Sequence, residues 1–340
     1  CIPTLDMSVS VAMRLSDRLH LIGNPIDMLP YYRDKSFMRK RLRECSLPCP
    51  DFSLCHTSEE VRDFARSHTF PLVIKTPQGA GSEQVFICTT EEELLLHFRE
   101  ICEQPNTYGQ RVQEAVVEEF LSGTEYIVDV FADGEKIHIT DVWFYDKTSI
   151  RDLKNIYYNI ISLPFDDPIV EKLSAATLRL CDAFKIQKGA VHFELKDDLK
   201  RGITLIEINV RLPGAGVPLL LRTTSNWDPF RSTIEVFTKG KTKLPQPIRM
   251  KHLAVVMCPL QQGGTVEKIE GIEEIQALPS YVRHVLYIHP GDQIDYTKHL
   301  FNLPYLVYLA HTDRAQLLKD VATAHQLFHI VYTRSTGKSA

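Results

Sequence analysis

The chain has 340 residues, of which 44% are hydrophobic and 24% charged, and its formal net charge at pH 7 is −4. This is the balance of a globular protein, and the length suffices for two or three domains with a sizeable core. The sequence has no basic run and no apolar stretch long enough to cross a bilayer, so neither nucleic acid nor a membrane is expected as a partner.

The first third of the chain reads as helices separated by short strands. Val9 to Leu21 is apolar at helical spacing, which predicts an amphipathic helix that Gly23-Asn24-Pro25 ends. Thr57 to Ser67 and Thr90 to Ile101 predict two further helices, each opening with a capped acidic turn.

Eight cysteines are scattered along the sequence. Cys45, Cys49 and Cys55, with His56 as a fourth ligand, are one candidate for a zinc cluster. Their spacing is irregular and prolines interleave, which favours reduced thiols in a cytoplasmic enzyme. The predicted location is therefore the cytoplasm.

A small-residue loop follows a buried strand between the second and third predicted helices. The strand covers 71–77 and carries Lys75, the loop is Gln78-Gly79-Ala80-Gly81-Ser82, and 85–88 would be the return strand. Small residues let backbone N–H groups approach phosphate oxygens, and the lysine supplies countercharge. The common P-loop is excluded, because no Gly-Lys-Ser/Thr opens a helix here.

The segment 126–144 predicts a hairpin with its turn at 132–135. Tyr145 to Pro164 has little periodicity, and its residues receive no roles. Pro168 to Phe184 is apolar at helical spacing and predicts a helix. From residue 247 onward, short strands alternate with helices at 271–278 and 313–328.

Two short apolar strands near the middle of the chain, at 189–195 and 205–214, flank a charged turn that ends in Gly202. Side chains alternate between the two faces of a strand. The residues between the polar ones are apolar, which argues against an ordinary solvated hairpin, the alternative interpretation. They are Val191, Phe193, Ile206, Ile208 and Val210.

If the strands pair, one surface collects His192 and Glu194 from the first with Glu207, Asn209 and Arg211 from the second. Nucleotide-bound Mg²⁺ typically uses one or two carboxylates together with phosphate oxygens. Arginine and histidine add positive charge where a phosphoryl group would be transferred. The surface therefore predicts a site for metal-assisted phosphoryl chemistry.

The run Glu207-Ile208-Asn209-Val210-Arg211, with Glu194 thirteen residues earlier, resembles the metal-binding strands of ATP-grasp enzymes. These enzymes use ATP to join a carboxylate to an amine or another nucleophile. Other family features recur in order along nearly the whole chain. The last part of the chain resembles the L-amino-acid ligase (dipeptide synthetase) and carnosine-synthase branch.

The resemblance implies an α+β ATP-grasp fold, in which two α+β lobes clamp ATP, with a small C-terminal α/β domain. The implied domains are a remnant of an N-terminal domain and linker at 1–30, a first lobe with the glycine-rich loop at 31–120, a second lobe with the metal site at 121–245, and the small domain at 246–340. Most of the family's N-terminal domain is expected to be missing from this sequence.

The resemblance also implies the roles of individual residues. Glu194, Glu207 and Asn209 would bind Mg²⁺, with Mn²⁺ as an alternative, and Arg211 and His192 would stabilise the transferred charge. Lys35 would lie on a helix running to about Cys45, and 145–164 would either border the acceptor site or form a surface loop. The residues expected to bind ATP are Lys35, Lys75, Gly79, Gly81, Ser82, Glu118, Glu119, Leu121 and Glu125.

The predicted activity is an ATP-dependent, ADP-forming ligase that joins a carboxylate, in the first place an amino acid, to an amine through an acyl phosphate. Its partners would be small-molecule substrates, with a homodimer as one option for assembly. The alternatives are a purine-biosynthesis or carbamoyl-phosphate type of ATP-grasp ligase, a small-molecule kinase, and a non-catalytic nucleotide-binding regulator. The second carboxylate argues against the regulator, which has no need of it.

Overall fold

The computed structural model describes residues 1–79, 81, 84–106, 109–150, 153–246, 248–298 and 300–333. No helix in this part of the chain is long and apolar enough to cross a membrane. The chain forms two compact units. The first comprises Cys1–Val142, Pro164–Arg222 and Asn226–Ile248, and the second comprises Trp143–Leu163, Thr223–Ser225 and the residues from Arg249 onward. The four-part division expected from the sequence stays a prediction.

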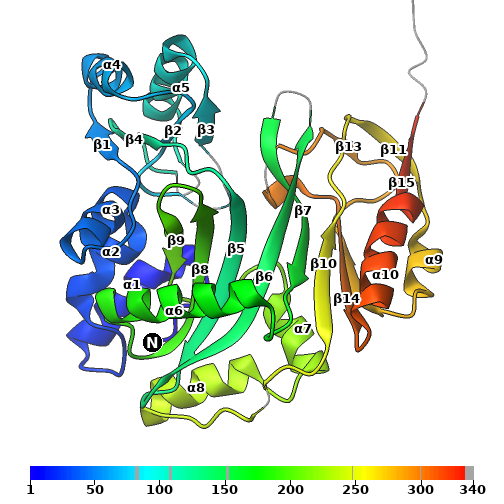
Figure 1. The fold of residues 1–340 in the computed structure, drawn as a ribbon. Helices are drawn as coiled ribbons and strands as arrows, with labels where there is room; N and C mark the ends of the chain where they lie inside the picture. The colour runs from blue at the N-terminus through cyan, green and yellow to red at the C-terminus, as the bar shows by residue number, and fades with distance from the viewer. Residues whose placement is uncertain are drawn as a thin grey trace, which may run out of the picture. The chain divides into compact units, whose positions relative to one another are not determined.

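A small antiparallel sheet in the first unit has the strand order β1-β4-β2-β3. Its strands are β1 (Phe52–Cys55), β2 (Leu72–Lys75), β3 (Val85–Cys88) and β4 (Ala115–Glu119). Helices α4 (Ser58–Ser67) and α5 (Glu91–Glu103) pack against it, as Figure 1 shows. Their buried apolar side chains form one core with the strands, which includes Val61, Phe64, Leu72, Ile74, Leu94, Phe98, Ile101 and Val117.

The start of α4 follows the capping pattern that its sequence predicts. The Thr57 hydroxyl accepts a hydrogen bond from the Glu60 N–H at 3.2 Å, and the Glu60 carboxylate accepts one from the Thr57 N–H at 3.2 Å. Two N–H groups that would otherwise lack partners are thereby satisfied.

Long antiparallel strands form the second sheet portion of the first unit. They are β5 (Thr124–Ala132), β8 (Gly189–Asp198), β9 (Gly202–Asn209) and the start of β6 (Ile137–Ile150), which passes into the second unit after Val142. β8 pairs with β5 on one side and with β9 on the other. The hairpin predicted from the middle of the sequence is therefore confirmed.

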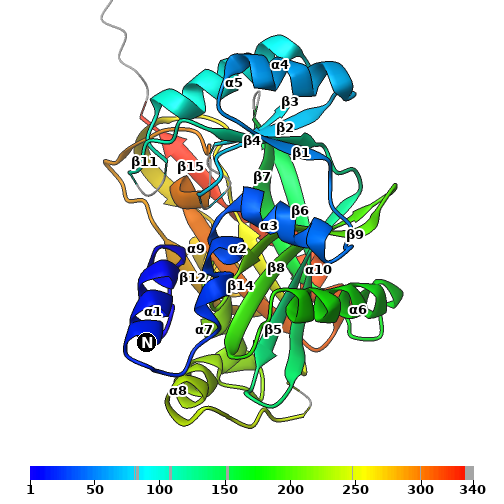
Figure 2. The same ribbon diagram turned by 90° about the vertical axis from the view of Figure 1, so that its left-hand side faces the viewer.

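Helices surround this sheet portion, and Figure 2 shows α1, α2 and α3 on the side of β9. The helices not yet given, up to residue 248, are α1 (Asp6–Arg18), α2 (Leu29–Arg33), α3 (Lys35–Glu44), α6 (Pro168–Ala183), α7 (Val217–Thr224) and α8 (Pro229–Lys239), with a 3-10 turn, η1, at Ile26–Met28. The buried Tyr32 hydroxyl donates to the Phe184 carbonyl at 2.7 Å, which ties α2 to the end of α6.

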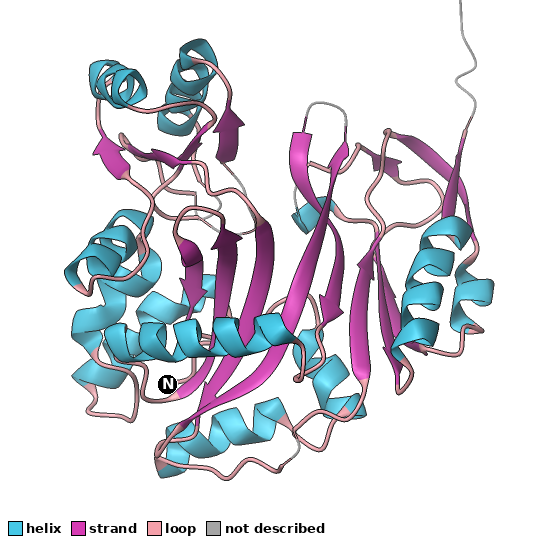
Figure 3. Ribbon diagram, in the orientation of Figure 1, coloured by secondary structure: helices cyan, strands magenta, loops and turns pink. Residues whose placement is uncertain are grey.

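The second unit also combines strands with helices (Figure 3). Its strands are the rest of β6, β7 (Leu153–Ser162), β10 (His252–Met257), β11 (Gly264–Glu270), β12 (Tyr281–Leu286), β13 (Gln293–Ile294), β14 (Tyr305–His311) and β15 (His329–Tyr332). Its helices are α9 (Ile272–Gln276) and α10 (Arg314–Leu327), with a 3-10 turn, η2, at Leu300–Asn302. α10 packs on β10 and β14 through Leu317, Val321 and Ala324.

The sequence predicted no helix or strand at 145–164 and no strand at the position of β1 (Phe52–Cys55). In the structure β6 continues through Tyr145 to Ile150, and β7 returns as its antiparallel partner. The pairing register shifts twice along this hairpin, first between Asp146 and Lys147. Each irregularity displaces the alternation of side chains, and this removes the period-2 pattern by which a strand is recognised.

Gly123, in the turn between β4 and β5, has a φ of +97°. A Cβ at this position would lie 2.1 Å from the carbonyl oxygen of Asp197. We expect Gly123→Ala to lower the free energy of unfolding by more than about 1–2 kcal/mol, the usual cost of this backbone region alone. Urea unfolding measures the change. The control is Gly214→Ala, where the added methyl group meets nothing within 4 Å; equal effects of the two substitutions would contradict the prediction.

Candidate active site

The predicted metal ligands meet on the β8–β9 hairpin. Glu194 pairs with Glu207 across the two strands, and Asn209 pairs with His192. Directly opposed side chains in such a pair start about 5 Å apart at Cβ. Two carboxylates and an amide oxygen form a donor set that fits a hard cation such as Mg²⁺ or Mn²⁺.

No three His, Cys, Asp or Glu side chains within the described residues gather as a metal-binding cluster. The eight cysteines, including those of the suspected zinc cluster, are free thiols. A cation on the hairpin would thus need further ligands from outside the protein, and nucleotide phosphates supply them in many Mg²⁺ sites.

Lys35 is brought to this face by the start of α3. Asp34 caps the helix, since its Oδ1 accepts hydrogen bonds from the N–H groups of Ser36 at 2.8 Å and Phe37 at 3.3 Å. The Lys35 Nζ lies 3.4 Å from Oε1 of Glu207, and its backbone N–H donates to the Pro77 carbonyl at 2.9 Å. The helix thus places a lysine between β9, which carries Glu207, and Pro77, which immediately precedes the glycine-rich segment.

A buried carboxylate, Glu118, is shared by two cations. Arg39 donates to it from Nε at 2.8 Å and from Nη2 at 3.2 Å, and the Lys75 ammonium donates to its Oε1. Arg39 also donates from Nη1 to the carbonyl of Leu205 at 2.8 Å. Arg39 therefore links α3 with β4 and β9, and Glu118 is a partner of Lys75.

The burial of this trio perturbs its ionisation. Burial raises the pKa of Glu118, but the charges of Arg39 and Lys75 outweigh it and lower that pKa to about 2. Burial lowers the pKa of Lys75 to about 8, because Glu118 compensates only part of it and the Arg39 charge acts in the same direction as burial. All three groups are thus charged at neutral pH.

His192 is buried against Asp129 of β5, and its Nδ1 lies 2.7 Å from the Asp129 Oδ1. Its Nε2 lies 3.6 Å from Oε1 of Glu194. Burial lowers the pKa of the imidazole, but the two carboxylates outweigh burial and raise it to about 9. His192 is therefore an imidazolium beside the predicted metal ligands.

Arg211 follows β9 and is held by α1. Its Nη2 donates to the Asp6 Oδ2 at 2.7 Å, and its Nη1 donates to the Leu212 carbonyl at 2.8 Å. Burial disfavours its charge, but Asp6, Glu207 and Glu194 together outweigh burial and raise the pKa of Arg211. The guanidinium thus stays charged, with Asp6 as its nearest carboxylate.

The remaining predicted nucleotide residues lie on β4 and β5 and in the segments that follow β2 and β4. Glu119 ends β4, and its carboxylate accepts from the Asp51 N–H at 2.9 Å and pairs with Arg201. The role of Glu119 in binding ATP stays a prediction.

Leu121 is buried after β4, and Glu125 lies on β5. Gly79 and Gly81 follow β2, while Ser82 lies outside the described residues. The roles assigned to all these residues stay predictions.

Sequence analysis did not identify three charged residues that hold the predicted site residues in place, namely Arg39, Asp129 and Asp6. Arg39 lies one helical turn after Lys35, a spacing that places both on one face of α3 and could have indicated it. Asp129 is an acidic residue inside the apolar run of β5, which is a weaker signal. Asp6 gave no signal.

Comparison with known proteins adds to this geometry. Residues 68–218 match the family described as "ATP-grasp domain". The chain contains an ATP-grasp domain. The predicted ATP-grasp fold is confirmed by the L-amino acid ligase from Bacillus licheniformis, whose crystal structure is similar with a TM-score of 0.82 at 18% identity, over 97% of this chain and 80% of that one.

Two curated relatives are ligases or synthases by name. Dapdiamide A synthase of Enterobacter agglomerans is 28% identical over 216 residues, which is 63% of this chain and 50% of the relative. The L-arginine-specific L-amino acid ligase of Bacillus subtilis is 20% identical over 298 residues, covering 86% of this chain and 70% of the relative. The chain thus spans about half the length of dapdiamide A synthase.

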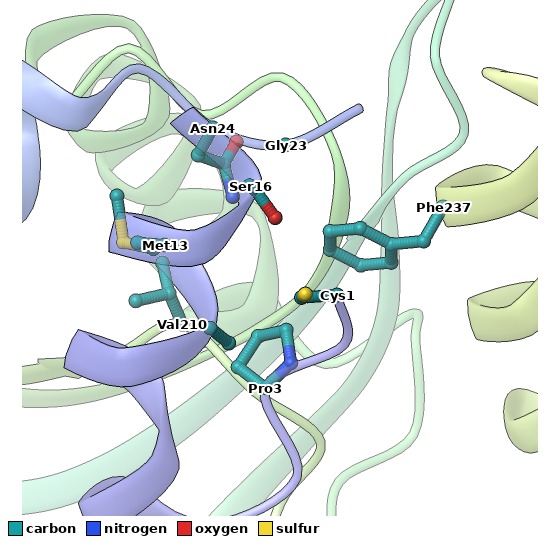
Figure 4. Close-up of a pocket in the computed structure, with 9 residues that line it drawn as sticks. Cys1, Pro3, Met13, Ser16, Gly23, Asn24, Val210 and Phe237 are labelled. Carbon is teal, nitrogen blue, oxygen red and sulfur yellow. The ribbon is translucent and has the colours of Figure 1, made fainter. Parts of the chain in front are cut away.

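A pocket in the same unit is lined by residues other than the predicted site residues (Figure 4). Its lining comes from the first residues of the chain, α1, the loop that follows α1, the residue after β9, and α8, namely Cys1, Pro3, Ala12, Met13, Ser16, Gly23, Asn24, Val210 and Phe237. None of the predicted site residues of the ATP-grasp domain is among them, so the pocket is not the candidate active site.

Replacing Arg39 tests the buried trio. Arg39→Met removes one of the two cations from a buried carboxylate, and we expect the free energy of unfolding to fall by about 3 kcal/mol. The control is Arg43→Met on the same helix, whose side chain is 50% exposed and pairs with Asp51. We expect a loss of less than about 1 kcal/mol for the control. Thermal or urea unfolding measures the free energy of unfolding of both variants. If both substitutions lowered it by the same amount, burial of the Arg39–Glu118 pair would not be the reason for the loss.

The lowered pKa of Lys75 leads to a pH-dependence of nucleotide affinity. The lysine is protonated below about pH 8 and neutral above it. The positive charge that Lys75 is predicted to bring to a bound phosphate is therefore lost as the pH rises. We expect the Kd for ADP to increase between pH 7 and 9.5. Lys75→Arg, which stays charged, should flatten this dependence. Parallel profiles for the two proteins, measured by titration with a fluorescent nucleotide, would assign the effect to another group.

Proposed function

We propose that this chain carries out ATP-dependent, ADP-forming ligation of a carboxylate to an amine, with amino acids as the substrate class. The observation that carries the proposal is the opposition of Glu194 and Glu207 on one hairpin, with Lys35 reaching Glu207 from α3. The printed names of dapdiamide A synthase and of the two L-amino acid ligases support amino acids as substrates.

In this proposal the chain's own residues prepare ATP for attack. Lys35 and Lys75 bring two positive charges to the phosphates, and the segment around Gly79 and Gly81 offers backbone N–H groups. Glu194, Glu207 and Asn209 would hold Mg²⁺, which when bound neutralises phosphate charge and orients the γ-phosphoryl group.

The reaction then has two transfers. An oxygen of the substrate carboxylate bonds to the γ-phosphorus while the bond to the ADP oxygen breaks, which gives an acyl phosphate and ADP. The amine bonds to the acyl carbon while the bond to the phosphate oxygen breaks, and the amine proton is released. Arg211 and His192, both cationic, stabilise the negative charge that develops on oxygen in these steps.

The free thiols are in keeping with the cytoplasm, which we propose as the location. Small molecules are the proposed partners, and a homodimer stays a prediction.

The test is phosphate release from Mg²⁺-ATP in the presence of paired L-amino acids. We expect release that requires both amino acids, and a fall of about 100-fold or more for Glu207→Gln, the loss known for removing one transition-state donor. The control is Glu267→Gln, an exposed glutamate on β11 in the second unit, which should leave the rate unchanged.

A stable phosphorylated product in place of free phosphate would identify a kinase. Nucleotide binding without phosphate release under any pairing would count against the ligase proposal.

A further inference from the structure

Asp6 stands between two arginines, one of which, Arg211, follows β9. We call the surface of β8 and β9 that carries Glu194, Glu207 and Asn209 the metal face. Its Oδ2 lies 2.7 Å from Nη2 of Arg211, and its Oδ1 lies 3.7 Å from Nη1 of Arg33. The side chains of Asp6 and Arg211 are only 17% and 13% exposed. The contact is therefore a largely dry ion pair, in which charge–charge attraction is stronger than at the surface.

The position of Asp6 in α1 favours its charge. It is the first residue of this 13-residue helix, whose N-cap residue, Leu5, provides no side-chain hydrogen bond. A negative charge at a helix N-terminus is stabilised by the helix dipole and by N–H groups that lack helical partners. The carboxylate is thus held ionised where it meets Arg211.

Each carboxylate of the metal face already has a basic side chain beside it. Lys35 lies 3.4 Å from Glu207, and His192 lies 3.6 Å from Glu194. Both carboxylates also attract Arg211. Among the described residues, however, the ion-pair partner of Arg211 is Asp6, and Arg211 makes no ion pair with Glu194 or Glu207.

A guanidinium on either of these carboxylates would compete with a divalent cation for the same oxygens. An arginine fork suits a carboxylate well and would pair with either one if released. Asp6 gives the guanidinium a closer carboxylate to pair with. In that position the positive charge of Arg211 remains available to a substrate, and the guanidinium does not cover the metal ligands.

We propose that Asp6 is a positioning residue: it holds Arg211 off Glu194 and Glu207 and so keeps these carboxylates available to a divalent cation. The inference rests on the metal site of the proposed function. Its test, however, reads metal binding and does not depend on turnover.

The experiment titrates Mn²⁺ into the protein at saturating ADP and follows free Mn²⁺ by electron paramagnetic resonance. We expect Asp6→Asn to weaken Mn²⁺ binding about tenfold, the lower end of the effect of groups that orient a metal site from outside it. The matched control is Asp17→Asn, the same change on the same helix at an exposed position, which should bind Mn²⁺ as the wild type does.

A double substitution separates positioning from the simple loss of a negative charge. If Asp6 acts through Arg211, Asp6→Asn should have no further effect on Mn²⁺ affinity once Arg211→Met has removed the guanidinium. The same tenfold loss in that background would show that Asp6 acts through its own field, and it would overturn the proposal. An unchanged affinity of Asp6→Asn, or no Mn²⁺ binding by the wild type, would overturn it as well.

Circular dichroism and thermal melting show that each variant is folded at the temperature of the titration, and Arg211→Gln replaces Arg211→Met if the latter is not folded. The proposal and the proposed function can fail separately. A protein that shows the Mn²⁺ effects but releases no phosphate contradicts the ligase. A protein that releases phosphate but lacks the Mn²⁺ effects contradicts the role of Asp6.

Discussion

One buried carboxylate, that of Glu118, organises the candidate active site. A buried charge is tolerated only with partners, and Glu118 has Arg39 from α3 and Lys75 from β2. Arg39 in turn donates to the backbone of β9 at Leu205. A helix, two strands of the small sheet and the metal strand thereby meet around one ion. Lys35 lies on the same helix as Arg39, and the glycine-rich segment follows soon after Lys75 at the end of β2. The positions of both therefore depend on this contact.

The same principle of pairing extends over the metal face. Glu207 faces Lys35. His192 lies between Asp129 and Glu194, and Arg211 is held by Asp6. Each pair joins side chains from different elements, with the sole exception of His192 and Glu194, which both lie on β8. Opposite charges held in this way are already oriented before a nucleotide arrives, and little reorganisation is left for the reaction itself.

Much of this could be predicted from local patterns. The period-2 alternation on β8 and β9 predicted that Glu194, Glu207 and Asn209 share a face, and the pairing register bears out that geometry. The strand with Lys75 was predicted from its short apolar run and the small-residue loop after it. The helix with Lys35 was predicted from the resemblance to ATP-grasp enzymes and not from its own pattern. The β6–β7 hairpin escaped prediction because its two register shifts break the alternation that would have revealed it.

The sequence by itself determined the chemical groups of the site, the order in which they occur and the strands that bear them, since these follow from short-range periodicity and turn residues. Tertiary structure alone decided which charges meet. Arg39 and Glu118 are 79 residues apart, His192 and Asp129 are 63 apart, and Arg211 and Asp6 are 205 apart. An ion pair is set by distance and burial in space, and nothing in the neighbouring residues of Asp6 or Arg39 encodes the partner that the fold brings to them.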